Sequence, residues 1–237
     1  MTPLNFLHIG KCAGNQIINF FSQVDTQSVG YKFIAHGHLT RLSDLPAGEP
    51  FFFSIRDPIE RFVSGFYSRK RCGAPKNNIS WSPAEASAFQ HFEHADDLAR
   101  VLSEESKQGS LARRALQSIY HTSQSQADWF ERQGFFLELT PPVWVVRVEY
   151  FTLDLNTLCQ RLGFQDLNVP SLISNDPLKS HAAPPSHRPI LSDTAKANLE
   201  AWYLRDFWFY RDVEHWMCSQ SVLVLSPGDR AVERSTN

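Results

Sequence analysis

The chain has few cysteines, and their spacing does not group them. Its four cysteines stand far apart among 237 residues and form no Cys-x-x-Cys pair: Cys12, Cys72, Cys159 and Cys218. Closely spaced cysteines are the signature of zinc sites and of disulfide frameworks. The sequence therefore indicates neither a metal site nor a disulfide framework, and it favours a reducing, cytoplasmic environment.

Long apolar runs and an excess of one charge are also missing. No stretch approaches the roughly 20 apolar residues that a membrane-spanning helix needs. Residues 1–14 lack a positive leader followed by an apolar run, so we expect no signal and no stable membrane insertion. The formal net charge is only −2, which argues against nucleic acid as a partner. Any bound anion must therefore meet a local cluster of positive groups.

The fold class follows from the apolar runs that are present. Hydrophobic residues make up 42% of the chain, as in ordinary globular proteins, and apolar runs of strand length lie at 5–9, 31–35, 51–55 and 143–148. Helical patterns lie at 15–21, from 58 onward, within 95–129, at 152–162 and at 193–216. Apolar strands that alternate with helices are typical of a parallel sheet covered on both faces. The sequence predicts a three-layer α/β fold with a central, mostly parallel sheet flanked by helices.

The length suggests one domain with insertions rather than two domains. We expect this domain to cover residues 1–218, with a helical and loop insertion at about residues 72–140. The polar residues that end the chain favour a partly disordered tail over 219–237.

A lysine stands among small residues directly after the first predicted strand, in the segment Gly10-Lys11-Cys12-Ala13-Gly14. A strand, a small-residue loop and a helix N-terminus together suit an anion, because backbone N–H groups can approach it and the lysine adds a full charge. The P-loop of nucleotide hydrolases differs, because its lysine comes at the end of the loop before Ser or Thr. The sequence therefore predicts an anion site of another kind, although a solvated lysine beside a turn would give the same pattern.

A second motif begins where the run 51–55 ends. Arg56 is followed by Asp57, a good helix N-cap, by Pro58, which suits the first helical position, and by Glu60, which can close a capping box. A helix is therefore expected directly after this strand, with Arg56 at the strand's mouth.

The same helix carries Arg61, Ser64 and Ser68 on one predicted face, whereas Ile59, Phe62, Val63 and Phe66 are expected to serve the core. An arginine fork with a serine hydroxyl one or two turns away is a suitable clamp for a phosphate.

These two motifs, with Arg-Asp-Pro-x-x-Arg-x-x-Ser as the more specific one, resemble those of sulfotransferases that use 3′-phosphoadenosine 5′-phosphosulfate (PAPS). The carbohydrate, Golgi-like branch is the most similar, and residues 146–164 and 199–210 also resemble its later segments. The resemblance implies a P-loop-like fold, PAPS as donor, adenosine 3′,5′-bisphosphate (PAP) as product, and no metal. It implies that Arg56 and Ser64 hold the 3′-phosphate. The 5′-phosphosulfate would then be held by the first loop: Gly10, Lys11, Cys12, Ala13, Gly14, Asn15 and Gln16.

The catalytic residues should include a charge stabiliser and a base. Lys11 is suited to stabilise charge on the leaving phosphate. His36-Gly37-His38 resembles the His-Gly-His segment of some carbohydrate sulfotransferases, in which a histidine is the base. Histidines at i and i+2 of an extended segment point to opposite faces, so we favour His38, with His36 second. His8 falls within a predicted strand and is expected to be a packed side chain.

The acceptor is expected to be a small molecule or a glycan. His121 and Gln126 match the family's His-x-x-x-x-Gln stretch, which lies near the acceptor. Residues 175–180, with Lys179, fall where the family often closes over the nucleotide. The basic run 69–71 could meet an anionic acceptor or form a solvated face, and the aromatic run 207–210 is expected in the core.

Two other functions remain open at this stage. A nucleotide-binding protein of the same fold could keep the site without catalysis, because Cys12, Ala13 and Asn15 depart from the family's first motif. A kinase-like P-loop enzyme is the less favoured alternative, because the Gly-Lys-Ser/Thr sequence is missing. The oligomeric state cannot be derived from the sequence.

Overall fold

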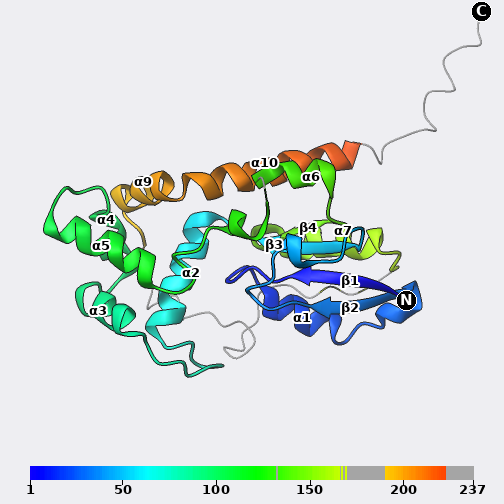
Figure 1. Cartoon of the computed structure of the whole chain (residues 1–237), viewed down its shortest axis with the longest axis horizontal. Coiled ribbons are helices and arrows are strands. Elements are labelled where there is room, and N and C mark those ends of the chain that lie inside the picture. Colours follow the sequence, from blue (N-terminus) through cyan, green and yellow to red (C-terminus); the bar gives the residue numbers. More distant parts are fainter. Residues whose placement is uncertain (132, 166, 168, 170–189, 223–237) are drawn as a thin grey trace, which may run out of the picture.

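A computed structural model describes residues 1–131, 133–165, 167, 169 and 190–222 (Figure 1). Four strands form one sheet in the order β2-β1-β3-β4, and every neighbouring pair is parallel. The strands are β1 (Thr2–Leu7), β2 (Tyr31–Ala35), β3 (Phe51–Ile55) and β4 (Val145–Arg147). The predicted α/β fold with a parallel sheet is thus confirmed. The first strand ends two residues earlier than predicted, which leaves His8 and Ile9 in the loop that follows.

Helices cover both faces of this sheet. They comprise α1 (Gly14–Phe21), α2 (Pro58–Lys70), α3 (Pro83–His91), α4 (Ala95–Arg100), α5 (Lys107–Ser118), α6 (Phe136–Leu139), α7 (Phe151–Arg161), α9 (Asp193–Trp202) and α10 (Leu204–Val222). Short 3-10 helices are η1 (Thr26–Val29), η2 (Leu42–Asp44), η3 (Gln126–Trp129), η4 (Gln133–Phe135) and η5 (Val148–Tyr150). Figure 1 shows α1 on one side of the sheet and α6 and α10 on the other.

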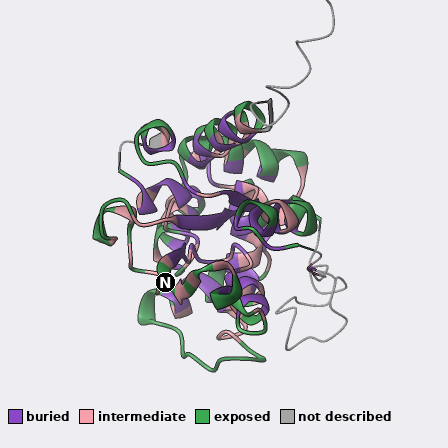
Figure 2. Cartoon of the chain, turned by 90° about the vertical axis from the view of Figure 1, so that its right-hand side faces the viewer, coloured by how far each residue is buried: buried purple, intermediate pink, exposed green. Residues whose placement is uncertain are grey.

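The phenylalanines of β3 explain why both faces of the sheet are buried. Phe52 packs toward α1, with its ring centroid 5.5 Å from that of Phe21. Phe53 points to the opposite face, where its ring lies 5.9 Å from Phe136 of α6 and 6.4 Å from Phe209 of α10. Successive side chains of a strand alternate between faces, so an unbroken apolar run requires cover on both sides. All five residues of β3 are buried, and the sheet forms the purple centre of Figure 2.

A second hydrophobic cluster lies beyond the carboxyl ends of the strands. Its buried members come from α2, α3, α4, α5 and α9, and they include Phe62, Phe66, Phe89, Leu98, Leu116 and Leu199. In Figure 1 these helices lie at the left, toward which β1 points. The predicted helical region 95–129 is thus present, but as α4, α5 and η3 with turns between them.

The single helix predicted at 193–216 is wrong, because the chain breaks at Tyr203 into α9 and α10. The Tyr203 hydroxyl donates a hydrogen bond of 2.7 Å to the carbonyl of Thr122. The Asn198 side chain donates to the carbonyls of Ala99 and Arg100, which ties α9 to α4. The break lets α9 join the second cluster while α10 crosses the sheet.

The basic run 69–71 is not a solvated face. Arg69 is buried, and its Nε and Nη2 atoms donate to the two carboxylate oxygens of Glu85 at 2.6 and 2.7 Å. Burial alone would raise the pKa of Glu85, but hydrogen bonds from Arg69, Ser82 and Tyr120 lower that pKa to about 2. Lys70 pairs with Glu93 at 2.7 Å. The Arg69–Glu85 pair is therefore a structural ion pair within the second cluster.

The aromatic run 207–210 lies only partly in the core. Phe209 is buried and Phe207 and Tyr210 are partly buried, whereas Trp208 is 55% exposed. Within the described residues, no helix combines the length and the apolar character that crossing a membrane requires.

Candidate functional site

The order of the strands creates a crevice at one edge of the sheet. From β1 the chain passes to β2 on one side, and it then enters β3 on the other side. In open α/β sheets, ligands bind outside the carboxyl ends of the strands where the order reverses in this way. The segments after β1, β2 and β3 carry Lys11, His38 and Arg56, so the topology brings the three main predicted residues to this edge.

The loop between β1 and α1 has the predicted strand, loop and helix arrangement. Lys11 and Ala13 have positive φ angles of 70° and 60°, so the backbone reverses its hand twice within three residues. Helix α1 begins at Gly14, and no side chain caps its N-terminus. The first N–H groups of a helix have no partner within the helix and carry partial positive charge. This loop can therefore present backbone donors and the Lys11 ammonium to an anion.

Buried hydrogen bonds hold the loop from beneath. The Ser54 hydroxyl donates to the carbonyl of Cys12 at 2.5 Å, and Arg61 Nε donates to the carbonyl of Gly10 at 3.0 Å. The Cys12 thiol donates to Gln126 Oε1 at 3.3 Å. Burial raises the pKa of this thiol to about 12, so it stays protonated. The Cys12 side chain is fully buried and cannot itself contact a ligand at the surface of the loop.

Three histidines from three segments meet beside the loop. The ring centroids of His8 and His38 lie 4.1 Å apart, and those of His38 and His121 lie 5.8 Å apart. The expectation that His8 is packed inside a strand is wrong, because β1 ends before it and its ring enters this group. We call His8, His38 and His121 the histidine cluster.

The histidine cluster requires glycine at two loop positions. A Cβ atom at Gly14 would lie 2.0 Å from His8 Nε2, and one at Gly10 would lie 2.7 Å from His121 Nδ1. Both distances are far below van der Waals contact, so the two rings sit directly against the backbone of the loop.

Two members of the histidine cluster are held in the neutral form. Burial, followed by the charges of His38 and Lys76, lowers the pKa of His8 to about 3. Burial, followed by the charge of Lys11, lowers the pKa of His121 to about 2. The cationic form is disfavoured because the rings are desolvated and already face positive groups.

Hydrogen bonds separate the roles of His38 and His36. His38 Nδ1 lies 2.9 Å from the carbonyl oxygen of His8. A carbonyl only accepts, so Nδ1 carries the proton, and Nε2 of the neutral ring keeps its lone pair. His36 Nε2 instead lies 2.8 Å from Oδ1 of Asn5, whose Nδ2 donates to Glu49. The two rings contact different groups, in agreement with the predicted opposite orientations.

Arg56 stands at the mouth of β3, as predicted. Its backbone N–H donates to Gln126 Oε1 at 2.9 Å, and its carbonyl accepts from Gln126 Nε2 at 2.8 Å. Its Nη2 lies 3.4 Å from a carboxylate oxygen of Glu60, while its Nε is buried without a hydrogen bond to any described residue. Ser64 is half-buried two turns into α2, after Arg56.

The start of α2 matches the prediction in part. Asp57 Oδ1 accepts from the backbone N–H of Glu60 at 2.9 Å, and Pro58 is the first helical residue. The predicted capping box is wrong, because Glu60 pairs with Arg56 and the N–H of Asp57 donates to Glu149 Oε1. Glu149, which the sequence reasoning missed, lies after β4 at the same edge of the sheet.

Arg61 is not on an exposed face with Ser64, because its side chain turns into the interior and is only 2% exposed. Besides its bond to Gly10, it donates from Nη1 to the carbonyl of Gln124 at 2.7 Å. It also opposes the negative charge of buried Asp206, whose pKa is raised by burial. Arginine is rarely buried, so spacing alone gave no signal for this position.

Gln126 does not lie where an acceptor could reach it. It is fully buried, its side chain bridges Cys12 and Arg56, and its backbone N–H donates to Asp206 Oδ1 at 2.7 Å. The expected acceptor contact of Gln126 therefore gives way to a positioning role. His121, in contrast, lies within the candidate site.

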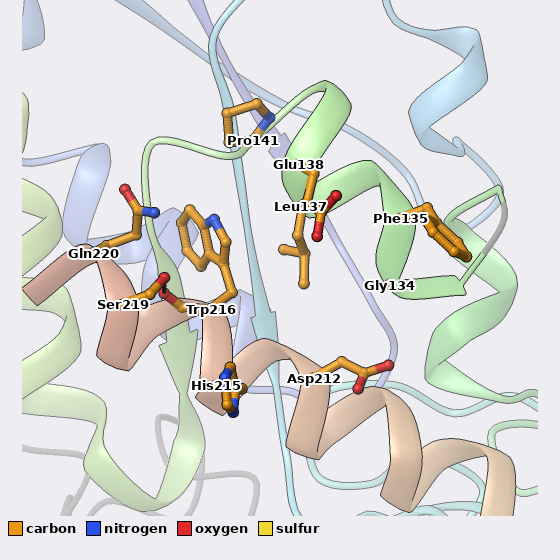
Figure 3. A pocket seen from close by; sticks show the side chains of 10 residues that line it. All are labelled: Gly134, Phe135, Leu137, Glu138, Pro141, Asp212, His215, Trp216, Ser219 and Gln220. Atoms are coloured by element: carbon orange, nitrogen blue, oxygen red, sulfur yellow. Dashed lines mark hydrogen bonds between the residues drawn. The ribbon is translucent and has the colours of Figure 1, made fainter.

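Two further observations concern the rest of the chain. Residues 175–180, including Lys179, lie outside the described residues, as does most of the expected tail 219–237. A separate cavity of about 970 Å³ lies between α6 and α10 and contains none of the predicted site residues (Figure 3). Among the described side chains, no group of three or more His, Cys, Asp or Glu residues is placed to hold a metal ion.

Comparison of the chain with protein-family models, with curated proteins and with solved structures finds no match. The function must therefore be argued from the site itself.

The contact between Gly14 and His8 gives a first prediction. Gly14→Ala should lower the free energy of unfolding by about 1–3 kcal/mol, because the new methyl group overlaps the His8 ring. The Gly14→Ala, His8→Ala double variant should be destabilised by less than the sum of the single variants. Urea denaturation of the four proteins measures this coupling.

Gly37→Ala is the matched control, because a Cβ atom at Gly37 has nothing within 4 Å. It should change stability by no more than about 0.5 kcal/mol. Additive effects of the Gly14 and His8 substitutions would contradict the contact.

The lowered pKa values of His8 and His121 give a second prediction. Below pH 6.5 the unfolded chain protonates these histidines while the folded chain keeps them neutral down to about pH 3. The free energy of unfolding should therefore fall with falling pH across this window, by up to about 1.4 kcal/mol per pH unit for each histidine. Urea denaturation at several pH values should show a smaller slope for His8→Asn, His121→Asn than for the wild type.

His91→Asn, which changes an exposed histidine on α3, should keep the wild-type slope. The pH argument fails if the His8 and His121 double variant keeps that slope as well.

Proposed function

We propose that this protein is a sulfotransferase with a P-loop-like fold, which transfers the sulfuryl group of PAPS to a hydroxyl of a small-molecule or glycan acceptor. The observation that carries the proposal is the meeting of the Lys11 loop, His38 and Arg56 at the strand-order reversal. An anion site, a basic nitrogen and a second cationic group are what such a transfer needs at one place.

The first loop and Arg56 suit the two ends of the donor. The positive φ angles of Lys11 and Ala13, and the uncapped N-terminus of α1, favour a phosphate or phosphosulfate group on the loop. Arg56 has a buried Nε without a hydrogen-bond partner among the described residues, although Nη2 faces Glu60. A guanidinium donor in this state favours a phosphate contact, because charge-assisted hydrogen bonds to phosphate are strong. Ser64 would add a hydroxyl to the 3′-phosphate.

The proposed chemistry divides the work between His38 and Lys11. PAPS would supply an activated sulfuryl group, whose bond to the 5′-phosphate breaks as a bond to the acceptor oxygen forms. His38 Nε2 would take the proton of the acceptor hydroxyl, because the bond from Nδ1 to the His8 carbonyl keeps Nε2 unprotonated in the neutral ring. Lys11 would stabilise the charge that grows on the leaving phosphate.

The second cluster supports an acceptor-side role for the insertion at about residues 72–140. Its helices α3, α4 and α5 stand beyond the carboxyl ends of the strands, next to the edge that carries the candidate site (Figure 1). This arrangement fits a single domain over residues 1–218 in which the sheet holds the donor and the inserted helices border the acceptor.

A nucleotide titration tests the proposed donor site. Arg56→Ala should weaken the binding of PAP by about 2 kcal/mol, or about 30-fold, because a charge-assisted contact to the 3′-phosphate is lost. The binding of AMP, which lacks that phosphate, should change little. Isothermal titration calorimetry with both nucleotides measures the difference.

Arg100→Ala is a matched control, because Arg100 lies on α4 with a side chain that is 56% exposed. It should leave both affinities unchanged. Equal losses of PAP and AMP binding in Arg56→Ala would contradict a 3′-phosphate contact, and wild-type protein that binds neither nucleotide would overturn the proposed donor.

A further inference from the structure

An unbroken series of aromatic rings leads from the histidine cluster to the surface. The His121 ring lies 5.8 Å from His38 on one side and 4.4 Å from Tyr120 on the other, measured between centroids. The Tyr120 side chain is 42% exposed, so the series ends in an aromatic face open to solvent. A ligand on Tyr120 would therefore lie beside the ring that we propose as the base.

The exposed end of this series is held in place by the Arg69–Glu85 ion pair. The backbone N–H of Tyr120 donates to Glu85 Oε1 at 3.1 Å. Trp81, which is 39% exposed, donates from its indole nitrogen to the carbonyl of Arg69 at 2.7 Å. Two partly exposed aromatic residues are thus fixed to the same buried pair. We call Tyr120 and Trp81 the ring surface.

A fixed and exposed aromatic face is of little use to the fold, because an exposed side chain adds little to stability. Aromatic residues do, however, contribute strongly to binding, because they offer a large rigid surface at a low entropic cost. The ring surface therefore suits the flat face of a ring in a ligand.

The charge beside the ring surface narrows the class of ligand. His121, which separates Tyr120 from His38, is kept neutral by its burial, and so is His8. The nearest charged side chains of the second cluster, Arg69 and Glu85, neutralise one another. The path from Tyr120 to His38 is therefore lined by uncharged rings, which favours an uncharged ligand.

We infer that Tyr120 is a specificity-determining residue that selects an uncharged, ring-shaped alcohol as acceptor and stacks on its flat face. This inference rests on the proposed function for the identity of the reaction. With the ring on Tyr120, a hydroxyl of the acceptor points along the series toward His38 Nε2. The shared chemistry is a ring with a weakly polar face and a hydroxyl group, which both a neutral sugar and a phenol possess.

Saturation-transfer difference NMR on the PAP-loaded protein tests the inference with three probes: methyl β-D-glucopyranoside, phenol and the open-chain polyol erythritol. At least one ring probe should bind the wild type more tightly than erythritol. Tyr120→Ala should weaken that binding fivefold or more, because the stacking face is lost. Tyr120→Phe, which keeps the ring, should restore it. The ring probe that binds distinguishes the sugar from the phenol.

Phe135→Ala is the matched control, because Phe135 is an exposed aromatic residue, 67% exposed, that lines the separate cavity between α6 and α10 (Figure 3). It should leave binding of the ring probe unchanged. Loss of binding in Phe135→Ala but not in Tyr120→Ala would place the ring in that cavity and overturn the inference. Equal binding of erythritol and both ring probes, or no binding of either ring probe, would also overturn it.

The failure of this inference can be separated from failure of the proposed function. Calorimetry with PAP on the same samples reports the donor site independently of the probes. Protein that binds PAP, with ring binding that ignores Tyr120, contradicts only the role of Tyr120. Should Tyr120→Ala fail to fold, transfer of saturation between the Tyr120 ring protons and the probe in the wild type decides the same question.

Discussion

The buried guanidinium of Arg61 is the contact on which the arrangement of the site depends. A charge in the interior is costly unless hydrogen bonds and opposite charge compensate it. Arg61 donates to the carbonyls of Gly10 and Gln124, and buried Asp206 opposes its charge. Because Arg61 belongs to α2, these bonds fix the first loop and the segment that follows His121 to the helix that begins after Arg56. The three parts of the candidate site therefore keep one geometry.

The two hydrophobic clusters explain why this site lies at the edge of the sheet. Helices cover both faces of the sheet, so polar side chains are concentrated where the strands end. The second cluster stands beyond these ends and supplies Tyr120 and His121 from the chain that follows α5. Glycine at positions 10 and 14 lets the rings of His121 and His8 press against the loop. The loop thus lies between two rings that burial keeps neutral, next to His38.

The sequence predicted the parts of this structure that depend on local pattern. The apolar runs became the four strands because residues buried on both faces must all be apolar, and Asp57 and Pro58 began α2 because both satisfy the free N–H groups of a first turn. The failures concern long-range partners. Glu60 meets Arg56 rather than the N–H of Asp57 because Glu149, 92 residues away, occupies that N–H. The burial of Arg61 and Gln126 likewise depends on Gly10, Gln124 and Asp206, which spacing within one helix cannot reveal.

The central claim is that His38 serves as the base of a sulfuryl transfer, and labelled sulfate transfer from PAPS to a panel of hydroxylated acceptors tests it most directly. His38→Ala should lower turnover by about 10²-fold or more and leave PAP affinity nearly intact, because a general base acts on the acceptor and not on the nucleotide. His36→Ala should have a small effect, since its ring is bonded to Asn5 on another part of the sheet. The account is contradicted if the wild type binds PAP but transfers sulfate to no acceptor, or if His36→Ala abolishes turnover and His38→Ala does not.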